Sequence, residues 1–211
     1  MQKLKIFLAE NYKWIILFIS IISLLFLIED VMDKDIMTFD ENGYLIVSKH
    51  LISKNMTSIE RLITNLGGIY WLVGFSIFLL IVIKNKKIPI SIMINLGLSA
   101  LLNFTLKQIL QRPRPIEHRI IDESGYSLPS GHSMVSMAYY GFLIYLIHKN
   151  IKNKYLKIFF ITLLSSLIIN IGISRIYLGV HYTSDVIAGF LVAISYLILY
   201  SNFIKKYISK I

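Results

Sequence analysis

The fold is decided by residues 158–185, IFFITLLSSLIINIGISRIYLGVHYTSD. Residues 158–174 carry no charged side chain and approach the length of roughly 20 residues that a helix needs to cross a bilayer. Lipid offers the backbone no hydrogen bonds, so an apolar run of this kind predicts a transmembrane helix. The residues that follow add an arginine, a histidine and an aspartate. The stretch therefore predicts a membrane helix that ends in a polar site.

The composition of the whole chain extends this prediction. Of 211 residues, 55% are hydrophobic and 16% are charged, and the mean hydropathy is +0.65. These values are typical of an integral membrane protein and exclude an ordinary soluble domain. The chain has no cysteine, which excludes disulfide bonds, thiolate zinc sites and cysteine-held iron–sulfur clusters.

Six apolar runs without a charged residue divide the chain. The first and fourth are short and are expected to extend through their flanking residues. We therefore expect an all-α fold, a bundle of six transmembrane helices that forms a single domain over residues 1–211. The runs cover residues 14–28, 62–83, 88–106, 133–147, 158–174 and 186–204.

The basic residues predict the orientation of these helices. The N-terminal segment, the 84–87 connection, the 149–157 connection and the C-terminal segment together hold 13 lysines and one acid, Glu10. The other three connections hold 9 basic and 11 acidic residues. By the positive-inside rule, both termini are cytoplasmic and these three connections face outward. The net charge of +10 is thus mainly a topology signal with some attraction to anionic lipid, and no nucleic-acid partner is expected.

The segment 29–61 is too polar to span a membrane. Its apolar residues, among them Leu45, Met56 and Ile59, recur at roughly helical spacing between charged residues. This pattern indicates an amphipathic interfacial helix on the outer face, between the first and second spans. A simple connector explains the segment equally well. If the surface helix forms, it could edge a lateral entrance for a lipid tail.

Three short polar blocks interrupt the apolar pattern. They are KQILQRPRP at 107–115, PSGH at 129–132 and SRIYLGVHYTSD at 174–185. The first two lie between the third and fourth runs, and the last lies between the fifth and sixth. An even number of crossings separates them, so all three are expected on the outward face. Topology therefore permits one shared site.

The cations in these blocks suit a phosphate ester. Phosphoryl transfer mainly demands positioned positive charge and amide donors, and Lys107, Arg114 and Arg175 are the candidates. The alternative for a lone lysine or arginine near a helix end is snorkelling to the membrane interface. We expect snorkelling for Arg112 and Arg119.

The PSGH block stands where the fourth span begins. Ser130 can cap the helix, Gly131 lets the backbone approach a ligand closely, and free amides at a helix N-terminus bind anions. An ordinary cap would explain Ser130 and Gly131 equally well, but it does not explain His132.

The last block places His181 and Asp185 four residues apart, so the two share a helix face if the last helix starts early. A carboxylate that accepts from one imidazole nitrogen fixes the tautomer and leaves the other nitrogen free to attack. A pair at this spacing is more often a structural hydrogen bond. Its position after Ser174 and Arg175, near a membrane face, favours the catalytic interpretation.

The blocks match the patterns K-x6-R-P, P-S-G-H and S-R-x5-H-x3-D at every fixed position. Together with six spans, these patterns resemble the signature of the type 2 phosphatidic acid phosphatase (PAP2) superfamily. The resemblance implies that His181 is the nucleophile, that Asp185 orients it, and that His132 is the general acid. No cofactor or metal is implied, and Asp122 and Glu123 are expected in an exposed loop. The residues implied to hold the phosphoryl oxygens are Lys107, Arg114, Ser130, Gly131 and Arg175.

By the same resemblance, the expected function is hydrolysis of a lipid phosphate or pyrophosphate through a phosphohistidine, at the outer face of a bacterial plasma membrane. We rank undecaprenyl pyrophosphate first, with phosphatidylglycerol phosphate and phosphatidic acid as alternatives. A lipid phosphotransferase and a non-catalytic membrane protein are the rival functions. The rate is expected to be bell-shaped in pH, because His181 must be neutral and His132 protonated. The sequence makes no prediction of the oligomeric state.

Overall fold

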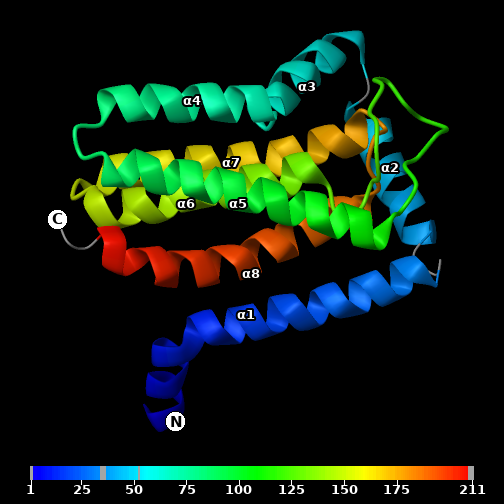
Figure 1. Cartoon of the computed structure of the whole chain (residues 1–211). Helices are drawn as coiled ribbons and strands as arrows, with labels where there is room; N and C mark the ends of the chain where they lie inside the picture. The colour runs from blue at the N-terminus through cyan, green and yellow to red at the C-terminus, as the bar shows by residue number, and fades with distance from the viewer. Residues whose placement is uncertain (1, 34–36, 52, 209–211) are drawn as a thin grey trace.

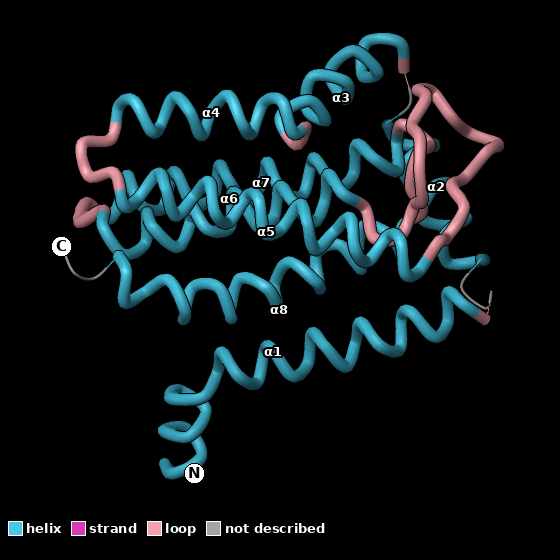
Figure 2. The backbone as a smooth tube through the Cα atoms, in the orientation of Figure 1, coloured by secondary structure: helices cyan, strands magenta, loops and turns pink. Residues whose placement is uncertain are grey.

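The computed structural model describes residues 2–33, 37–51 and 53–208, which form helices joined by loops (Figure 1). Figure 2 shows no strand in this part of the chain. The all-α prediction is therefore confirmed for the described residues. The helices are α1 (Gln2–Met32), α2 (Met37–Leu51), α3 (Lys54–Leu66), α4 (Ile69–Val82), α5 (Lys87–Leu110), α6 (Gly131–Asn150), α7 (Lys154–Tyr177) and α8 (Thr183–Ile208).

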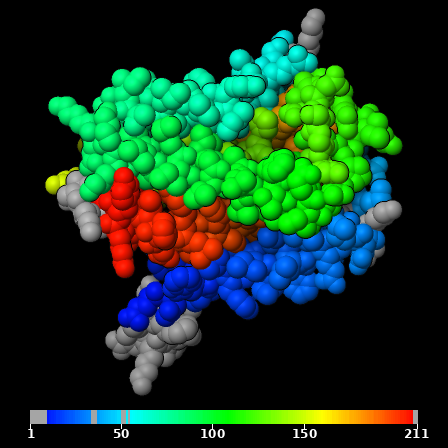
Figure 3. Space-filling view, viewed as in Figure 1, coloured from blue at the N-terminus to red at the C-terminus, as the bar shows by residue number. Residues whose placement is uncertain are grey.

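Helix α6 lies at the centre of the bundle. It packs against α5, α7 and α8, while α4 packs on α5 and α1 runs along α8. Helices α2 and α3 gather at one end, together with the long loop between α5 and α6 (Figure 1). The space-filling view shows α4 and α1 on opposite sides of α5 and α8 (Figure 3). The three motif blocks lie at the end that carries α2 and the long loop.

Local signals set the helix ends that position these blocks. The side chain of Ser130 caps α6 by accepting a hydrogen bond from the backbone N–H of Ser133. Helix α5 stops at Gln111, which adopts a left-handed conformation with φ 45° and donates its N–H to the carbonyl of Lys107. Pro113 follows and cannot continue the helix. The C-terminal ends of α5 and α7 therefore meet the N-terminal ends of α6 and α8.

Helix α6 turns polar side chains into the protein. The hydroxyl of Tyr139 lies 2.9 Å from that of Ser76 on α4, and Nδ2 of Asn95 on α5 donates to the carbonyl of Ala138 at 2.9 Å. These hydrogen bonds link α6 to α4 and α5 inside the bundle. The buried side chains packed around them include Leu72, Ile92, Leu96, Phe142 and Ile171.

Four helical segments are long and apolar enough to cross a membrane: Glu10–Met32, Lys87–Leu110, Lys154–Tyr177 and Thr183–Ile208. The pair Asn55–Leu66 and Ile69–Val82, bent by 52°, raises the number to five if it counts as one span. Helix α6 is not among these segments, because its histidines, serines and tyrosines lower its mean hydropathy. The described residues thus hold four to five candidate spans by length and composition, fewer than the six predicted.

The apolar run 62–83, predicted as one helix, is broken between α3 and α4. The N–H of Gly67 donates to the carbonyl of Thr64 at 2.9 Å, and the N–H of Gly68 donates to that of Asn65 at 3.0 Å. These bonds close the last turn of α3. A Cβ at Gly67 would lie 2.6 Å from Cγ2 of Ile171 on α7, so the glycine permits α3 to pack closely on α7.

The segment 29–61 forms the end of α1, helix α2 and most of α3, while residues 34–36 and 52 lie outside the described part. It contains two short helices where one amphipathic helix was predicted. Helix α2 packs on α7 and α8, and α3 packs on α7. Asp40 and Glu60 are buried, with exposed fractions of 4% and 3%. The simple-connector alternative is wrong, and a location of these helices at the membrane interface stays a prediction.

Candidate active site

A histidine and a carboxylate form the centre of the site. Nδ1 of His181 lies 3.3 Å from Oδ2 of Asp185, and the backbone N–H of Tyr182 donates to the same oxygen at 2.9 Å. Both side chains are buried. His181 precedes α8, because Gly179, with φ 67°, turns the chain after α7. The predicted pair forms, although its two residues do not share one helix.

Arg114 fixes the protonation state of His181. Its Nη1 lies 3.0 Å from Nε2 of His181 and donates to the carbonyl of Val180 at 2.9 Å. A guanidinium can only donate, so Nε2 accepts and the ring proton is on Nδ1, facing Asp185. Burial, opposed by Asp185 and reinforced by Arg175 and Arg114, lowers the pKa of His181 to about 4. His181 is therefore a neutral imidazole whose Nε2 lone pair faces a cation.

A second guanidinium lies in the site with a carboxylate against it. Arg175 is 1% exposed; its Nη1 donates to Oγ1 of Thr64 at 2.8 Å, and its Nη2 pairs with Oε1 of Glu123. Its Nε is buried and has no hydrogen-bond partner among the described residues. Burial raises the pKa of Glu123, but Arg175, Arg114 and His181 together outweigh it, so the pKa lies below its ordinary value. The prediction that Glu123 belongs to an exposed loop is wrong, since it is a half-buried ion-pair partner.

The N-terminus of α6 faces Lys107 of α5. A Cβ added at Gly131 would lie 3.0 Å from Oδ1 of Asn103 and 3.9 Å from Cε of Lys107, so the glycine allows a close approach. Nζ of Lys107 donates to the carbonyl of Tyr126 and, at 3.2 Å, to that of Ser127. A helix start and an ammonium group, two elements that favour an anion, are thus adjacent.

Ser130 and His132 flank this glycine. Oγ of Ser130 accepts from Oγ of Ser133 at 2.9 Å, and its backbone N–H donates to the carbonyl of Asp185 at 3.0 Å. The ring of His132 lies near the break between α3 and α4, where a Cβ added at Gly68 would be 3.8 Å from Nε2. The titratable groups that act on this ring are Arg175, His181, Arg114 and Lys107. All of the predicted site residues therefore lie together at one end of the bundle.

Arg112, Ser184 and Asp40, which were not predicted to belong to the site, extend it. Nη1 of Arg112 donates to Oδ1 of Asp185 and to Oγ of Ser184, both at 2.7 Å. Its Nη2 lies 2.6 Å from Oδ2 of Asp40 on α2. The side chain of Arg112 is 11% exposed, so the snorkelling predicted for it is wrong. Arg119 is exposed, and its snorkelling to the membrane interface stays a prediction.

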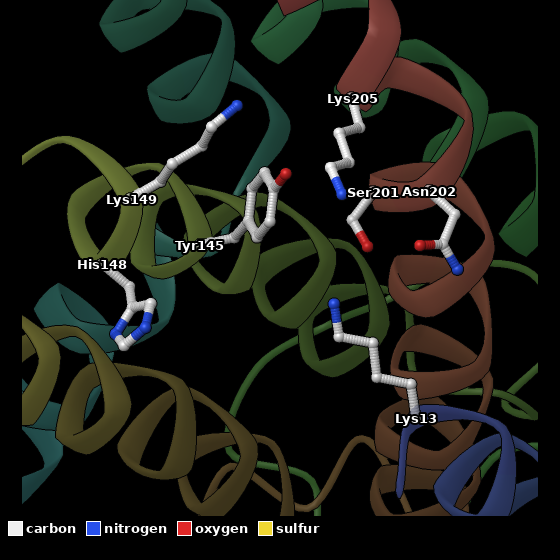
Figure 4. A pocket seen from close by; sticks show the side chains of 7 residues that line it. All are labelled: Lys13, Tyr145, His148, Lys149, Ser201, Asn202 and Lys205. Atoms are coloured by element: carbon white, nitrogen blue, oxygen red, sulfur yellow. The ribbon is translucent and has the colours of Figure 1, made fainter. Parts of the chain in front are cut away.

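A separate pocket of about 230 Å³ lies at the opposite end of the bundle, away from the motif blocks. Lys13 of α1 and Lys205 of α8 reach toward each other across it, with the hydroxyl of Ser201 between them (Figure 4). Its lysines come from segments predicted to be cytoplasmic. The pocket is therefore distinct from the candidate active site. It is lined by Lys13, Tyr145, His148, Lys149, Ser201, Asn202 and Lys205.

The fold is similar to that of two proteins of known structure. The crystal structure of a transmembrane PAP2-type phosphatidylglycerolphosphate phosphatase from Bacillus subtilis matches with a TM-score of 0.81 and 25% identity, over 90% of this chain and 96% of that chain. The crystal structure of Aquifex aeolicus LpxE matches with a TM-score of 0.61 and 22% identity, over 75% of this chain and 92% of that chain. The second likeness concerns the fold alone.

The sequence also matches a curated protein and a family model. Phosphatidylglycerophosphatase B of Bacillus subtilis (strain 168) is 36% identical over 112 residues, which are 52% of this chain and 55% of that protein. The chain thus matches about half the length of this curated relative. A family model described as the PAP2 superfamily matches residues 89–209, a region that contains all of the predicted site residues, from Lys107 to Asp185. The chain therefore belongs to the PAP2 superfamily.

Proposed function

We propose that the protein is a lipid phosphatase that removes a phosphoryl group from a lipid phosphate or pyrophosphate through a phosphohistidine at His181. The contact between Arg114 and His181, with 3.0 Å between Nη1 and Nε2, carries this proposal. A phosphoryl group bound by Arg114 would lie directly beside the Nε2 lone pair of the nucleophile. A purely structural His–Asp pair needs no cation at its far nitrogen.

The reaction would take two steps. In the first, Nε2 of His181 attacks phosphorus, the bond from phosphorus to the leaving oxygen breaks, and His132 donates a proton to that oxygen. Asp185, through Nδ1, stabilises the charge that develops on the imidazole. In the second step, water attacks the phosphohistidine and gives a proton to His132, and phosphate leaves. His181 and His132 then hold the protons with which they began.

The phosphoryl oxygens would be held by the positive groups of the site: Lys107, Arg114 and Arg175, with Ser130 and the amide of Gly131. The buried Nε of Arg175, a donor without a partner among the described residues, supports this role because a charged donor in such a place favours an anionic acceptor. Glu123 already pairs with the same guanidinium. A substrate phosphate must therefore displace this carboxylate or share the guanidinium with it.

The proposal includes a topology. A single domain over residues 1–211 would cross a bacterial plasma membrane six times, through α1, α4, α5, α6, α7 and α8, with both termini cytoplasmic. The central position of α6 supports counting it as a span. The pocket lined by Lys13, Lys149 and Lys205 lies at the end opposite to His181, and basic residues favour the cytoplasmic side. The active site would then open at the outer face.

Two lipids are equal first candidates for the substrate. Undecaprenyl pyrophosphate is proposed from the sequence resemblance, and phosphatidylglycerol phosphate is proposed because the matched Bacillus subtilis relative is a phosphatidylglycerophosphatase B. Phosphatidic acid is the third candidate. The lipids differ in the group that leaves in the first step. The pyrophosphate loses a lipid monophosphate, whereas each of the two monoesters loses an alkoxide that must be protonated.

Phosphate release by the detergent-purified protein tests the proposal. The three lipids are offered separately with EDTA present, and His181→Ala is the control. We expect release from at least one lipid and none from the variant. Activity that survives in His181→Ala would overturn the phosphohistidine mechanism. A phosphorylated product that forms only when a lipid or sugar acceptor is added would favour a phosphotransferase. No release of phosphate from any of the three lipids would overturn the phosphatase proposal.

A further inference from the structure

The carboxylate of Asp185 has two charged partners. Its Oδ2 faces His181, while its Oδ1 accepts a hydrogen bond from Nη1 of Arg112 at 2.7 Å. The same guanidinium also pairs with a second carboxylate, since Nη2 of Arg112 lies 2.6 Å from Oδ2 of Asp40 on α2. The four side chains form a row that begins at the nucleophile and ends on a helix distant in sequence.

Asp40 also joins α2 to the start of α8. Its Oδ1 accepts from the backbone N–H of Ser184 at 2.8 Å, and its Oδ2 accepts from the hydroxyl of Ser184 at 2.8 Å. A Cβ added at Gly43 would lie 2.0 Å from Oγ1 of Thr183, so α2 touches the first turn of α8 directly. Asp40 thus satisfies a free N–H group of that turn and fixes α2 beside Asp185.

The charges in this row are buried. The side chains of Asp40, Arg112 and Asp185 are 2%, 11% and 0% exposed. Ions that are removed from water are retained only with partners of opposite charge, so each of these groups keeps its neighbours ionised. The guanidinium of Arg112 also lies over the ring of Tyr182, 4.0 Å from the centroid. Arg112 is therefore held from several sides, which suits positioning better than ligand binding.

We propose that Arg112 and Asp40 are positioning residues for the reaction. Arg112 holds the carboxylate of Asp185 in place for His181, and Asp40 balances part of the positive charge of Arg112. The inference rests on the proposed function, since it takes His181 as the nucleophile. Asp40 lies outside residues 89–209, which the PAP2 family model matches. Helix α2 would therefore complete an active site whose other charged residues lie within the matched region.

Arg112 and Asp40 change the pKa of His181 in opposite directions. Without Arg112, the full negative charge of Asp185 acts on the imidazole and raises the pKa of His181. Without the charge of Asp40, more of the positive charge of Arg112 is unbalanced, and the pKa of His181 falls. The other charged or titratable groups that face His181 or Asp185 are Arg114, Glu123, Arg175, His132, Lys107 and Tyr182.

The pH dependence of kcat/KM in the variants Arg112→Gln and Asp40→Asn tests the proposed positioning role. The acid limb should move up by about one pH unit in Arg112→Gln and move down in Asp40→Asn. In the double variant, the limb should lie close to that of Arg112→Gln, because Asp40 acts mainly through Arg112. Arg112→Lys retains the charge, so its limb should stay near the wild-type position. Its kcat should fall about tenfold, because an ammonium cannot bridge two carboxylates in the same geometry.

Two exposed neighbours provide matched controls. Arg119→Gln removes a cation from the same loop as Arg112, and Glu41→Gln removes an acid from the same helix as Asp40; both side chains are exposed. Neither control should move the acid limb. A folded Arg112→Gln or Asp40→Asn protein that is less stable but has the wild-type pH profile would show a merely structural role. That result would overturn the inference.

A titration of His181 by NMR, in protein with isotope-labelled histidine, separates this inference from the proposed function. The His181 signal, assigned by its loss in His181→Gln, should titrate at a higher pH in Arg112→Gln and at a lower pH in Asp40→Asn. A wild-type protein that releases no phosphate would contradict the proposed function alone. Equal pKa values in all three proteins would overturn the inference alone. If Arg112→Gln does not fold, Asp40→Asn and Arg112→Lys carry the same test.

Discussion

Nε2 of His181 accepts a hydrogen bond from Nη1 of Arg114 over 3.0 Å. The lone pair proposed to attack phosphorus is therefore occupied by a group proposed to bind the phosphoryl oxygens. Substrate must redirect this N–H from nitrogen to oxygen, which would bring phosphorus in front of Nε2. The carbonyls of Gly125 and Ser124 accept from the other nitrogens of Arg114, each at 3.0 Å. The guanidinium is thus held near its position while this exchange occurs.

The pH dependence of the reaction should reflect the low pKa of His181. Burial lowers this pKa from 6.5 to about 4, and only the neutral ring can attack. The protonated, inactive form accumulates below the folded-state pKa, so the acid limb of kcat/KM is expected near pH 4. Rates with a short-chain, water-soluble lipid phosphate measure this limb. An acid limb near the ordinary histidine value of 6.5 would contradict the prediction.

Arg114→Gln provides the matched variant for this measurement. It removes one of the cations that lower the pKa of His181, so the acid limb should move to higher pH. It should also reduce kcat/KM by about 10²-fold or more, because a positioned donor to the transferring group is lost. A lower rate with an unmoved limb would mean that Arg114 binds substrate without acting on the imidazole.

His132 is predicted to matter most when the leaving group needs a proton. An alkoxide that leaves a lipid monoester is strongly basic, whereas p-nitrophenolate leaves without protonation. His132→Gln should therefore lower kcat/KM for the lipid monoester by about 10²–10⁴-fold and for p-nitrophenyl phosphate by only about tenfold. The ratio kcat/KM reports the steps up to the phosphohistidine, so the second step does not mask the difference. Equal losses on both substrates would show that His132 is not the general acid.

The helices and the positions of the motif residues could be predicted, because both depend on neighbouring residues in the sequence. Each of the six apolar runs lies within helix apart from the break in 62–83, because hydrophobicity over a bilayer length is a property of neighbouring residues. The motif residues were predictable for the same reason: a cap at Ser130, a stop at Pro113 and a turn at Gly179 place the three blocks at helix ends. Their common location follows from the number of crossings between them.

The remaining features depend on contacts between distant segments. Nothing in the sequence distinguishes Asp40, which is buried against Arg112, from its exposed neighbour Glu41. Arg112 resembles any arginine at a helix end. The only local feature that links it to the predicted site residue Arg114 is the repeated R-P of RPRP. The polar character of α6 follows from its central position. A hydropathy criterion that assumes contact with lipid therefore does not count α6 as a span.

Glu123→Gln should reveal whether the carboxylate of Glu123 competes with phosphate for Arg175. In the free protein, Glu123 neutralises a guanidinium that is proposed to bind phosphoryl oxygens. Removing this charge should lower the inhibition constant of inorganic phosphate about three- to tenfold. It should also cost about 1 kcal/mol of stability, less than a fully buried pair because the side chain of Glu123 is 28% exposed. Asp122→Asn, at the exposed neighbour, is the control, and equal inhibition of both variants would exclude the competition.

Gly131→Ala should impair activity without unfolding the protein. The added Cβ would lie 3.0 Å from Oδ1 of Asn103, so the start of α6 must shift by a few tenths of an ångström relative to Lys107. A shift of this size between groups that hold one phosphoryl moiety should reduce kcat/KM about tenfold. Alanine favours a helix over glycine, which offsets the tight contact in the unfolding free energy. The effect should therefore appear in kinetics and not in thermal unfolding.

Gly97→Ala on α5 is the control for this substitution, because its added Cβ would meet no atom within 4 Å apart from its chain neighbours and the adjacent backbone of α5. It should leave kcat/KM unchanged and stabilise the protein by about 0.5–1 kcal/mol. Both variants gain the same methyl group, but only the one at Gly131 faces Asn103 and Lys107. Equal kinetics in the two variants would therefore mean that the close approach of α6 to α5 has no part in binding the phosphoryl group.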